Sequence, residues 1–248
     1  MQQFFFLHIP KTAGTSFSTF LCDHFNPAET LLGGYWETIR KQPISELGKY
    51  RLITGHIGYE LTFQLTNPFV IAIFRHPVDR LCSVYEYLNQ VFDNDPNLGD
   101  PDPDINGFIQ LWKIAVRRPF AEFLDSTEAP VLAALLRNPQ SRQLAQSTPY
   151  LLSDFSDEQI FQLAAPRLKK IDVVGTVENF ADVVTVTCKK AGWPLPADLT
   201  RFNQNITEKR SVRDTLDQSL RKKIETFAAV DVEMYQLAQK RLLEDLRQ

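Results

Sequence analysis

The sequence predicts an α/β fold in which a mostly parallel central sheet is flanked by helices. Short apolar runs without polar alternation recur along the chain, and this pattern is typical of strands buried on both faces of a sheet. Segments with helical spacing of apolar residues separate these runs, and strands that alternate with helices form parallel sheets. The chain has 248 residues, 44% of them hydrophobic, which suffices for a large core. We therefore predict a single domain over residues 1–248.

Four apolar segments are predicted to be the strands: 4–9, 51–55, 69–74 and 171–176. Helical periodicity predicts helices over 14–25, 77–88, 105–116, 129–136, 156–168 and 179–191. Two long C-terminal helices follow, with a break predicted at Asp231. Residues 93–106 hold five aspartates and three prolines and are predicted to form a loop.

The segment after the first strand has the composition of an anion-binding loop. Lys11 is followed by Gly14 and by three hydroxyl residues, Thr12, Thr15 and Ser16. The free amides and the positive dipole end of a helix that begins near Gly14 attract anions, and glycine allows a close approach of the backbone to a ligand. An ordinary turn capped by Thr15 or Ser16 is the alternative, although a cap requires only one hydroxyl.

The spacing of this loop argues against an ATPase or kinase of the common phosphate-loop type. That loop reads G-x-x-x-x-G-K-[ST], with the lysine after the last glycine. Here Lys11 precedes Gly14, and no glycine precedes Lys11.

Polar residues follow three of the predicted strands at the same end. Lys11, His56 and Arg75 each lie just past the carboxyl end of a different strand. Ligands of open parallel sheets bind beyond these ends. We therefore expect the three residues to form one site.

The whole-chain composition excludes some classes of protein. The net charge of −3 predicts no general attraction to nucleic acid. The cysteines are odd in number and far apart, which predicts free thiols, a reducing compartment and no metal site; Cys82 is expected to be a buried helix thiol. We see no cleavable signal and no apolar stretch of about 18 residues, so we expect a cytoplasmic protein without a membrane span.

Two motifs resemble those of the PAPS-dependent sulfotransferases, whose sulfuryl donor is 3′-phosphoadenosine 5′-phosphosulfate (PAPS). Residues 6–16, FLHIPKTAGTS, resemble the 5′-phosphosulfate loop, and residues 73–85, IFRHPVDRLCSVY, resemble the 3′-phosphate motif. The similarity is greatest to carbohydrate sulfotransferases of the heparan sulfate 2-O type and their bacterial relatives. It implies a single-domain P-loop-like fold, with PAPS as co-substrate, adenosine 3′,5′-bisphosphate as product and no metal.

The resemblance also implies roles for individual residues. Lys11 stabilises charge on the bridging oxygen as the S–O bond breaks, and Arg75 and Ser83 bind the 3′-phosphate. The 5′ end of the donor is held by the loop residues Thr12, Ala13, Gly14, Thr15 and Ser16.

Thr54-Gly55-His56 resembles the histidine motif of the 2-O enzymes, which makes His56 the expected catalytic base. A histidine with a pKa near 7 suits this proton transfer. Those enzymes have two histidines around the glycine, whereas this chain has one. Other branches use a glutamate, so Glu60 and Glu37 remain alternatives, and a structural histidine is a further one.

A late segment, 203–210, resembles the part of the family that closes over the nucleotide, which implies that Lys209 and Arg210 bind the donor. Residues 201–223 hold seven Lys or Arg and three acidic residues. A solvated basic helix face explains this excess equally well.

These features predict transfer of a sulfuryl group from PAPS to a hydroxyl of a glycan or small molecule. A catalytically inactive relative and a small-molecule kinase with a degenerate loop are the alternatives. Segment 91–170 matches no motif and is expected to be a helical insertion that shapes the acceptor pocket. Aromatic residues at helical spacing more often pack in a core than stack on sugars, so we expect core positions for the aromatic residues of this segment: Phe108, Trp112, Phe120, Phe123 and Tyr150.

Overall fold

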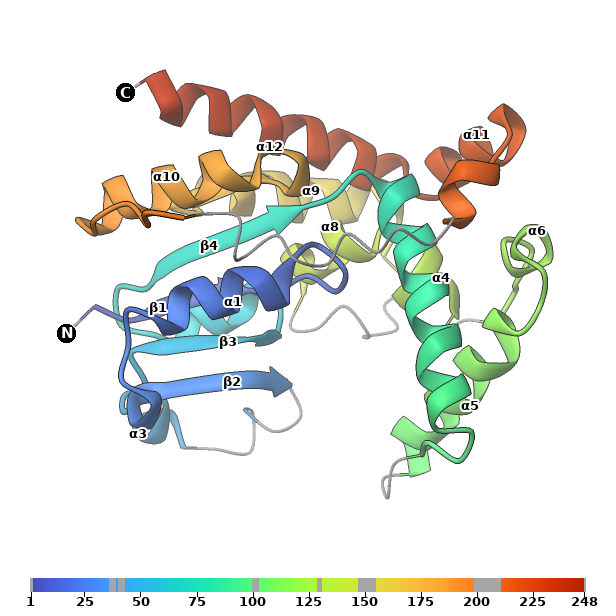
Figure 1. The fold of residues 1–248 in the computed structure, drawn as a ribbon, viewed down its shortest axis with the longest axis horizontal. Coiled ribbons are helices and arrows are strands. Elements are labelled where there is room, and N and C mark those ends of the chain that lie inside the picture. The colour runs from blue at the N-terminus through green and yellow to red at the C-terminus, as the bar shows by residue number, and fades with distance from the viewer. Residues whose placement is uncertain are drawn as a thin grey trace.

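The computed structural model describes residues 2–35, 39, 43–99, 103–128, 131–146, 155–198 and 211–247. Five parallel strands form one sheet in the order β2-β3-β1-β4-β5 (Figure 1). The strands are β1 (Phe4–Leu7), β2 (Thr30–Tyr35), β3 (Leu52–His56), β4 (Phe69–Phe74) and β5 (Val173–Thr176). The α/β fold with a parallel sheet between helices is therefore confirmed.

The two faces of the sheet pack against different helices, because successive side chains of a strand point to opposite sides. On one face, Phe4 and Phe6 of β1 belong to a core cluster with residues of α1 (Gly14–Cys22) and α10 (Phe180–Ala191). On the other face, Phe5 and Leu7 belong to a cluster with residues of α8 (Pro139–Ala145), α9 (Asp157–Lys169) and α12 (Ala229–Arg247).

A third cluster lies beyond the carboxyl ends of the strands. Figure 1 shows α4 standing to one side of the sheet, with α5, α6 and α11 beside it. The elements are α4 (Pro77–Asn94), α5 (Pro103–Val116), α6 (Phe120–Phe123), η3 (Leu132–Leu136) and α11 (Gln218–Phe227). Trp112, Phe120 and Phe123 pack in this cluster, which confirms that they are core residues. Neither the Phe108 side chain nor Tyr150 belongs to the described part of the chain.

Short elements complete the described ranges: η1 (Pro27–Glu29), α3 (Ile44–Leu47), η2 (Tyr59–Gln64), η4 (Val177–Asn179) and η6 (Val212–Thr215). The prediction missed β2, because Gly33 and Gly34 interrupt its apolar run. This edge strand is irregular: its register with β3 shifts between Leu31 and Gly34, and Gly33 has a φ of 64°.

The break between the C-terminal helices lies at Ala228, so its prediction at Asp231 was wrong. Asp231 belongs to the first turn of α12, and its buried carboxylate accepts hydrogen bonds from α8 instead of ending a helix. Across the described residues, no helix is both long enough and apolar enough to cross a membrane.

Candidate active site

The carboxyl ends of three adjacent strands bring the predicted residues together. Leu7 of β1 is level with Gly55 of β3 on one side and with Ala72 of β4 on the other. The segments that carry Lys11, His56 and Arg75 therefore leave the same edge of the sheet. Their convergence follows from the strand order, in which β1 lies between β3 and β4.

The loop between β1 and α1 has an unusual backbone. Lys11 and Ala13 have φ values of 66° and 62°, a left-handed conformation that non-glycine residues rarely adopt. Such strain persists only where the surroundings enforce it, and it is concentrated at functional sites. Thr12 is fully buried and its Oγ1 donates to the carbonyl of Ile9 at 2.9 Å, which closes the loop from within.

Helix α1 begins at Gly14, and its N-cap residue Ala13 makes no side-chain hydrogen bond. The first amides of a helix have no partner inside the helix. Thr15 and Ser16 do not cap α1, so the ordinary capped turn is not the structure of this loop. Within the described ranges, the hydroxyls of Thr15, Ser16 and Ser83 make no hydrogen bond, which leaves them free for a ligand.

Gly14 lies against the imidazole of His8. A Cβ added at Gly14 would fall 1.7 Å from Nε2 of His8. The His8 ring is stacked on Phe6, with ring centroids 5.6 Å apart. Glycine at position 14 is therefore required for the close approach of the histidine as well as for access to the helix amides.

Two cations meet at this loop. Nη1 of Arg75 donates to the carbonyl of Lys11 at 3.4 Å. Burial, and then the charge of Arg75, lower the pKa of Lys11, and burial lowers the pKa of Arg75. Each lowered pKa reflects the free-energy cost of keeping a positive charge in a partly desolvated environment. An anion bound between the lysine, the arginine and the start of α1 would remove this cost, so the residues present fit a phosphosulfate group.

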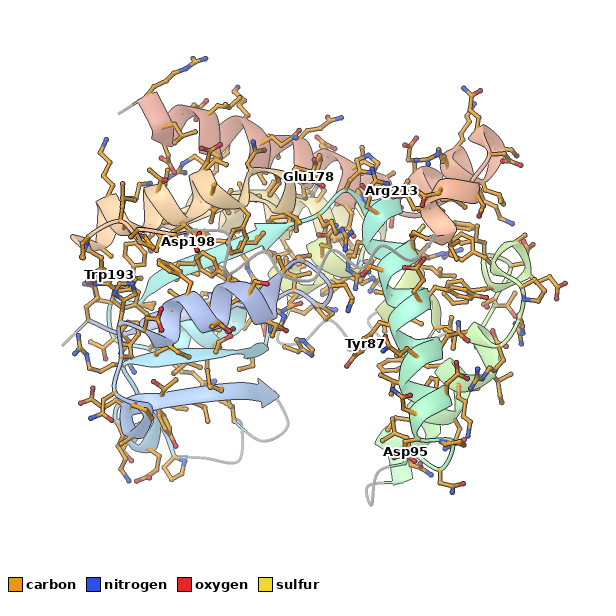
Figure 2. All side chains as sticks on the ribbon, viewed as in Figure 1. Tyr87, Asp95, Glu178, Trp193, Asp198 and Arg213 are labelled. Atoms are coloured by element: carbon orange, nitrogen blue, oxygen red, sulfur yellow. The ribbon has the colours of Figure 1, made fainter. Side chains whose placement is uncertain are left out.

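The Lys11 ammonium lies over the ring of Tyr87, with Nζ 4.0 Å from the centroid. Figure 2 shows Tyr87 projecting from α4 toward the strand ends. Ser83 lies one turn before Tyr87 and is half-buried. Helix α4 therefore contacts the loop through Tyr87, and Ser83, four residues earlier, lies on the same side of the helix.

His56 has a partner that the sequence interpretation missed. The rings of His8 and His56 lie edge to face, with centroids 4.8 Å apart. Burial, and then the charge of Arg80, lower the pKa of His56 to about 4. Burial, followed by the charges of His56 and Lys11, lowers the pKa of His8 to about 3. Both rings are neutral at pH 7, so the expected pKa near 7 for His56 was wrong for the site without ligand.

The signal for His8 was present in the sequence. It directly follows β1, just as His56 ends the adjacent strand β3, and its amide donates to Gly55 at 3.2 Å. A second imidazole thus lies beside His56, and it belongs to the residue that follows the neighbouring strand.

Helix α8 supports the site with two buried glutamines. Gln140 accepts from the amide of Arg75 at 3.0 Å and donates to its carbonyl at 2.9 Å. Gln143 donates to the carbonyls of His8 and Ile57, both at 3.0 Å. Part of segment 91–170 therefore anchors the loops of the site. No sequence motif marked these residues.

The late basic segment is only partly described. Lys209 and Arg210 lie outside the described residues, as do Glu37 and the rest of 199–210. Beyond them, Arg213 pairs with Asp79 of α4 at 3.0 Å, and Lys223 pairs with Asp125 at 2.6 Å.

The remaining candidates lie in structural contacts. Glu60, an alternative base, lies 3.6 Å from Arg167. Cys82 is buried, and burial raises the pKa of its thiol to about 12, so the prediction of an inert helix thiol is confirmed. In the described part of the chain, no group of three or more His, Cys, Asp or Glu side chains is placed to hold a metal ion.

Comparison with models of protein families identifies a family for this chain. The model of a family described as "Sulfotransferase family" covers residues 1–247. No curated protein matches the sequence.

Proposed function

This chain belongs to the sulfotransferase family, and from that membership we propose that it transfers the sulfuryl group of PAPS to a hydroxyl of a carbohydrate. Sulfuryl transfer itself, as a reaction of the EC 2.8.2 type, follows from the family. We add three proposals to this: PAPS is the donor, a hydroxyl oxygen is the acceptor, and the chain is related to the 2-O-type enzymes.

One observation supports PAPS most strongly. Lys11 and Arg75 carry desolvated positive charge beside the uncapped start of α1. The backbone and hydroxyls of the loop, Thr12 to Ser16, would hold the 5′-phosphosulfate. Arg75 and Ser83 would hold the 3′-phosphate, with Lys209 and Arg210 as further contacts. A 3′-phosphate, which ATP lacks, distinguishes PAPS from ATP.

In the proposed reaction, His56 accepts the proton of the acceptor hydroxyl as its oxygen attacks sulfur. The bond from sulfur to the bridging oxygen breaks in line and leaves its electron pair on the 5′-phosphate, where Lys11 stabilises the charge. A neutral imidazole is the form that accepts a proton, and burial keeps His56 neutral. The negative charge of the bound donor opposes the effect of Arg80 and makes His56 a stronger base in the complex.

The acceptor part of the proposal concerns the helices beside α4. We propose that α5, α6 and the rest of segment 91–170 shape the acceptor pocket of one domain that spans the chain. The three cysteines are free, which supports our proposal of a reducing, cytoplasmic setting.

Transfer of ³⁵S from labelled PAPS to a panel of glycosaminoglycan oligosaccharides tests this proposal. We expect label in at least one oligosaccharide and none in the same reaction with Lys11→Ala. Label in no hydroxyl acceptor, despite binding of adenosine 3′,5′-bisphosphate, would favour an inactive relative.

A further inference from the structure

Arg80 is a buried cation beside the proposed site. It lies in the first turns of α4 and is 2% exposed. Its Nε donates to the carbonyl of Pro10 at 3.1 Å, and Arg75 donates to the next carbonyl, that of Lys11. Two arginines therefore hold two consecutive carbonyls of the loop.

These contacts fix the peptide that carries Lys11. The left-handed φ of Lys11 is a conformation that its own side chain disfavours. An external hydrogen bond to the carbonyl of Pro10 restrains the peptide plane between Pro10 and Lys11. The direction in which the Lys11 side chain leaves the loop depends on that plane.

A buried carboxylate balances the charge of Arg80. Asp231 is 1% exposed and accepts hydrogen bonds from the amides of Gln140 and Ser141 and from the Ser141 hydroxyl, at 3.1, 2.7 and 2.6 Å. Burial raises the pKa of Asp231, while the Ser141 contacts and the charge of Arg80 oppose the rise. A buried cation without such a counter-charge is costly.

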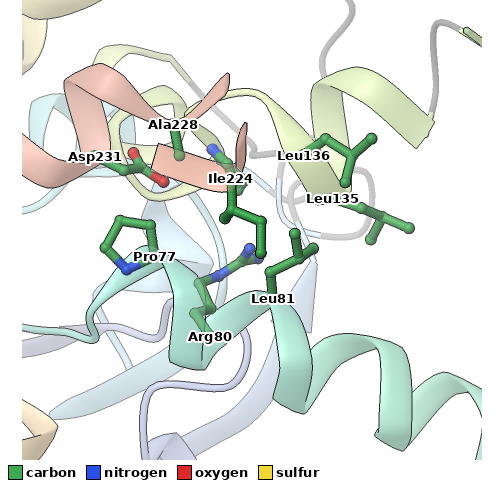
Figure 3. A pocket seen from close by; sticks show the side chains of 9 residues that line it. Pro77, Arg80, Leu81, Leu135, Leu136, Ile224, Ala228 and Asp231 are labelled. Atoms are coloured by element: carbon green, nitrogen blue, oxygen red, sulfur yellow. The ribbon is translucent and has the colours of Figure 1, made fainter. Parts of the chain in front are cut away.

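Figure 3 shows Arg80 and Asp231 among the side chains that line a small cavity between α4 and the C-terminal helices. Its volume is about 10 Å³, and the other lining residues are apolar or proline. This space is close to the minimum for one water molecule, so it is no substrate site. Arg80 and Asp231 thus both line an interior space that is too small for a ligand.

We propose that Arg80 is a positioning residue that couples Lys11 and His56, the two proposed catalytic groups, to the buried carboxylate of Asp231. Through its hydrogen bond it orients the loop that carries Lys11. Its charge adds to the effect of burial, which is the larger cause of the neutral state of His56. This inference rests on the proposed function only for the roles of Lys11 and His56.

The groups that act on the histidines come from three elements. Arg80 of α4 lowers the pKa of His56, and His56 and Lys11 lower that of His8, which directly follows β1. Removal of Arg80 alone should therefore raise the midpoint of His56 by about one unit. It should stay below 6.5, because burial is the larger cause.

The test is a titration of the histidine rings by ¹H–¹⁵N NMR between pH 3 and 8, on the full chain without ligand, because this range includes the lowered pKa of His56 at about 4. The four histidines are assigned with single His→Gln variants. Arg80→Met removes the charge, and Arg80→Lys retains it. Arg142→Met is the matched control, because Arg142 is 7% exposed and its Nε also donates to a backbone carbonyl, that of Arg137, at 3.1 Å.

We expect the His56 midpoint to rise in Arg80→Met but not in Arg80→Lys or Arg142→Met. Asp231→Asn should not raise it, because this change removes a negative charge and leaves the positive charge of Arg80 in place. Affinity for adenosine 3′,5′-bisphosphate, measured by calorimetry, should fall about tenfold in Arg80→Met and be partly restored in Arg80→Lys.

An unchanged His56 midpoint in Arg80→Met, or an equal rise in Arg142→Met or Asp231→Asn, would overturn the inference. If Arg80→Met does not fold, Arg80→Gln removes the same charge with a polar side chain, and its titration decides the inference in the same way. The titration needs no nucleotide. A wild-type protein that binds no bisphosphate would therefore contradict the proposed function while the titration still decides whether Arg80 acts on His56.

Discussion

The ammonium of Lys11 lies 4.0 Å from the centroid of the Tyr87 ring. Lys11 follows β1 and belongs to the first motif, and Tyr87 lies in the middle of α4, the helix that carries most of the second motif, so this contact joins the loop to that helix. Tyr87 is 48% exposed, and a side chain so exposed contributes little to the core. Its ring is placed to hold Lys11 toward the site.

We predict that Tyr87→Leu lowers kcat about threefold, whereas Tyr87→Phe retains the wild-type value. The ring face attracts the cation by about 0.5–1 kcal/mol at an exposed position, and phenylalanine keeps that face. Phe63→Leu is the control, since Phe63 is 70% exposed and also lies near a cation, Arg167. Steady-state sulfuryl transfer measures the effect, and an equal loss in Tyr87→Phe would exclude the cation–π explanation.

Lys11→Ala should lower kcat by about 10²–10³-fold, because the charge on the bridging oxygen then has no cation beside it. Affinity for adenosine 3′,5′-bisphosphate should fall far less, since the 3′-phosphate contacts remain. Lys49→Ala, which removes an exposed lysine paired with Glu46, is the control. Turnover near the wild-type value in Lys11→Ala would rule out the mechanism.

Gly14→Ala should destabilise the protein by about 1–3 kcal/mol, as overpacking of a filled interior does. The new Cβ meets the imidazole of His8, which lies between Phe6 and His56 and has little room to turn. In the double variant with His8→Ala, the loss should be smaller than the sum of the single losses. Urea unfolding measures this coupling, with Gly107→Ala, where a Cβ meets nothing within 4 Å, as the control.

Stability should fall as the pH falls below 6.5. The folded pKa values of His8 and His56 are lowered to about 3 and about 4 from the ordinary histidine value of 6.5, mainly by burial. Between these values and 6.5 the unfolded chain binds protons that the folded chain excludes, so acid favours unfolding. The stabilisation is complete only above 6.5.

The free energy of unfolding in urea at pH 7 and pH 5 tests this dependence. The difference between the two should be smaller in the variant His8→Gln/His56→Gln than in the wild type. Asp231, whose pKa is raised by burial, acts in the opposite direction but is present in both proteins. Equal differences in the two proteins would show that the histidines titrate normally.

The residues past the strand ends were predictable, because continuous apolar runs mark where a buried strand stops. The start of α1 at Gly14 followed from the periodicity of Phe17, Phe20 and Leu21, which are all fully buried. Both kinds of signal are local in the sequence.

The buried residues that hold the site in place were not predictable from such local signals. Gln140 accepts a hydrogen bond from the amide of Arg75, which lies 65 residues earlier. Asp231 accepts one from the amide of Ser141, which lies 90 residues earlier. Glutamine and aspartate are common on surfaces, so only the tertiary structure shows that these are buried. The His8–His56 pair needed the strand order, which places β1 next to β3.

Calorimetry with adenosine 3′,5′-bisphosphate, and with ATP and Mg²⁺ in parallel, tests the proposed donor site most directly. We predict that the bisphosphate binds at least about tenfold more tightly, because Arg75 and Ser83 meet a 3′-phosphate that ATP lacks. Ser83→Ala should reduce this preference. Tighter binding of ATP with Mg²⁺ would contradict the assignment of PAPS as the donor.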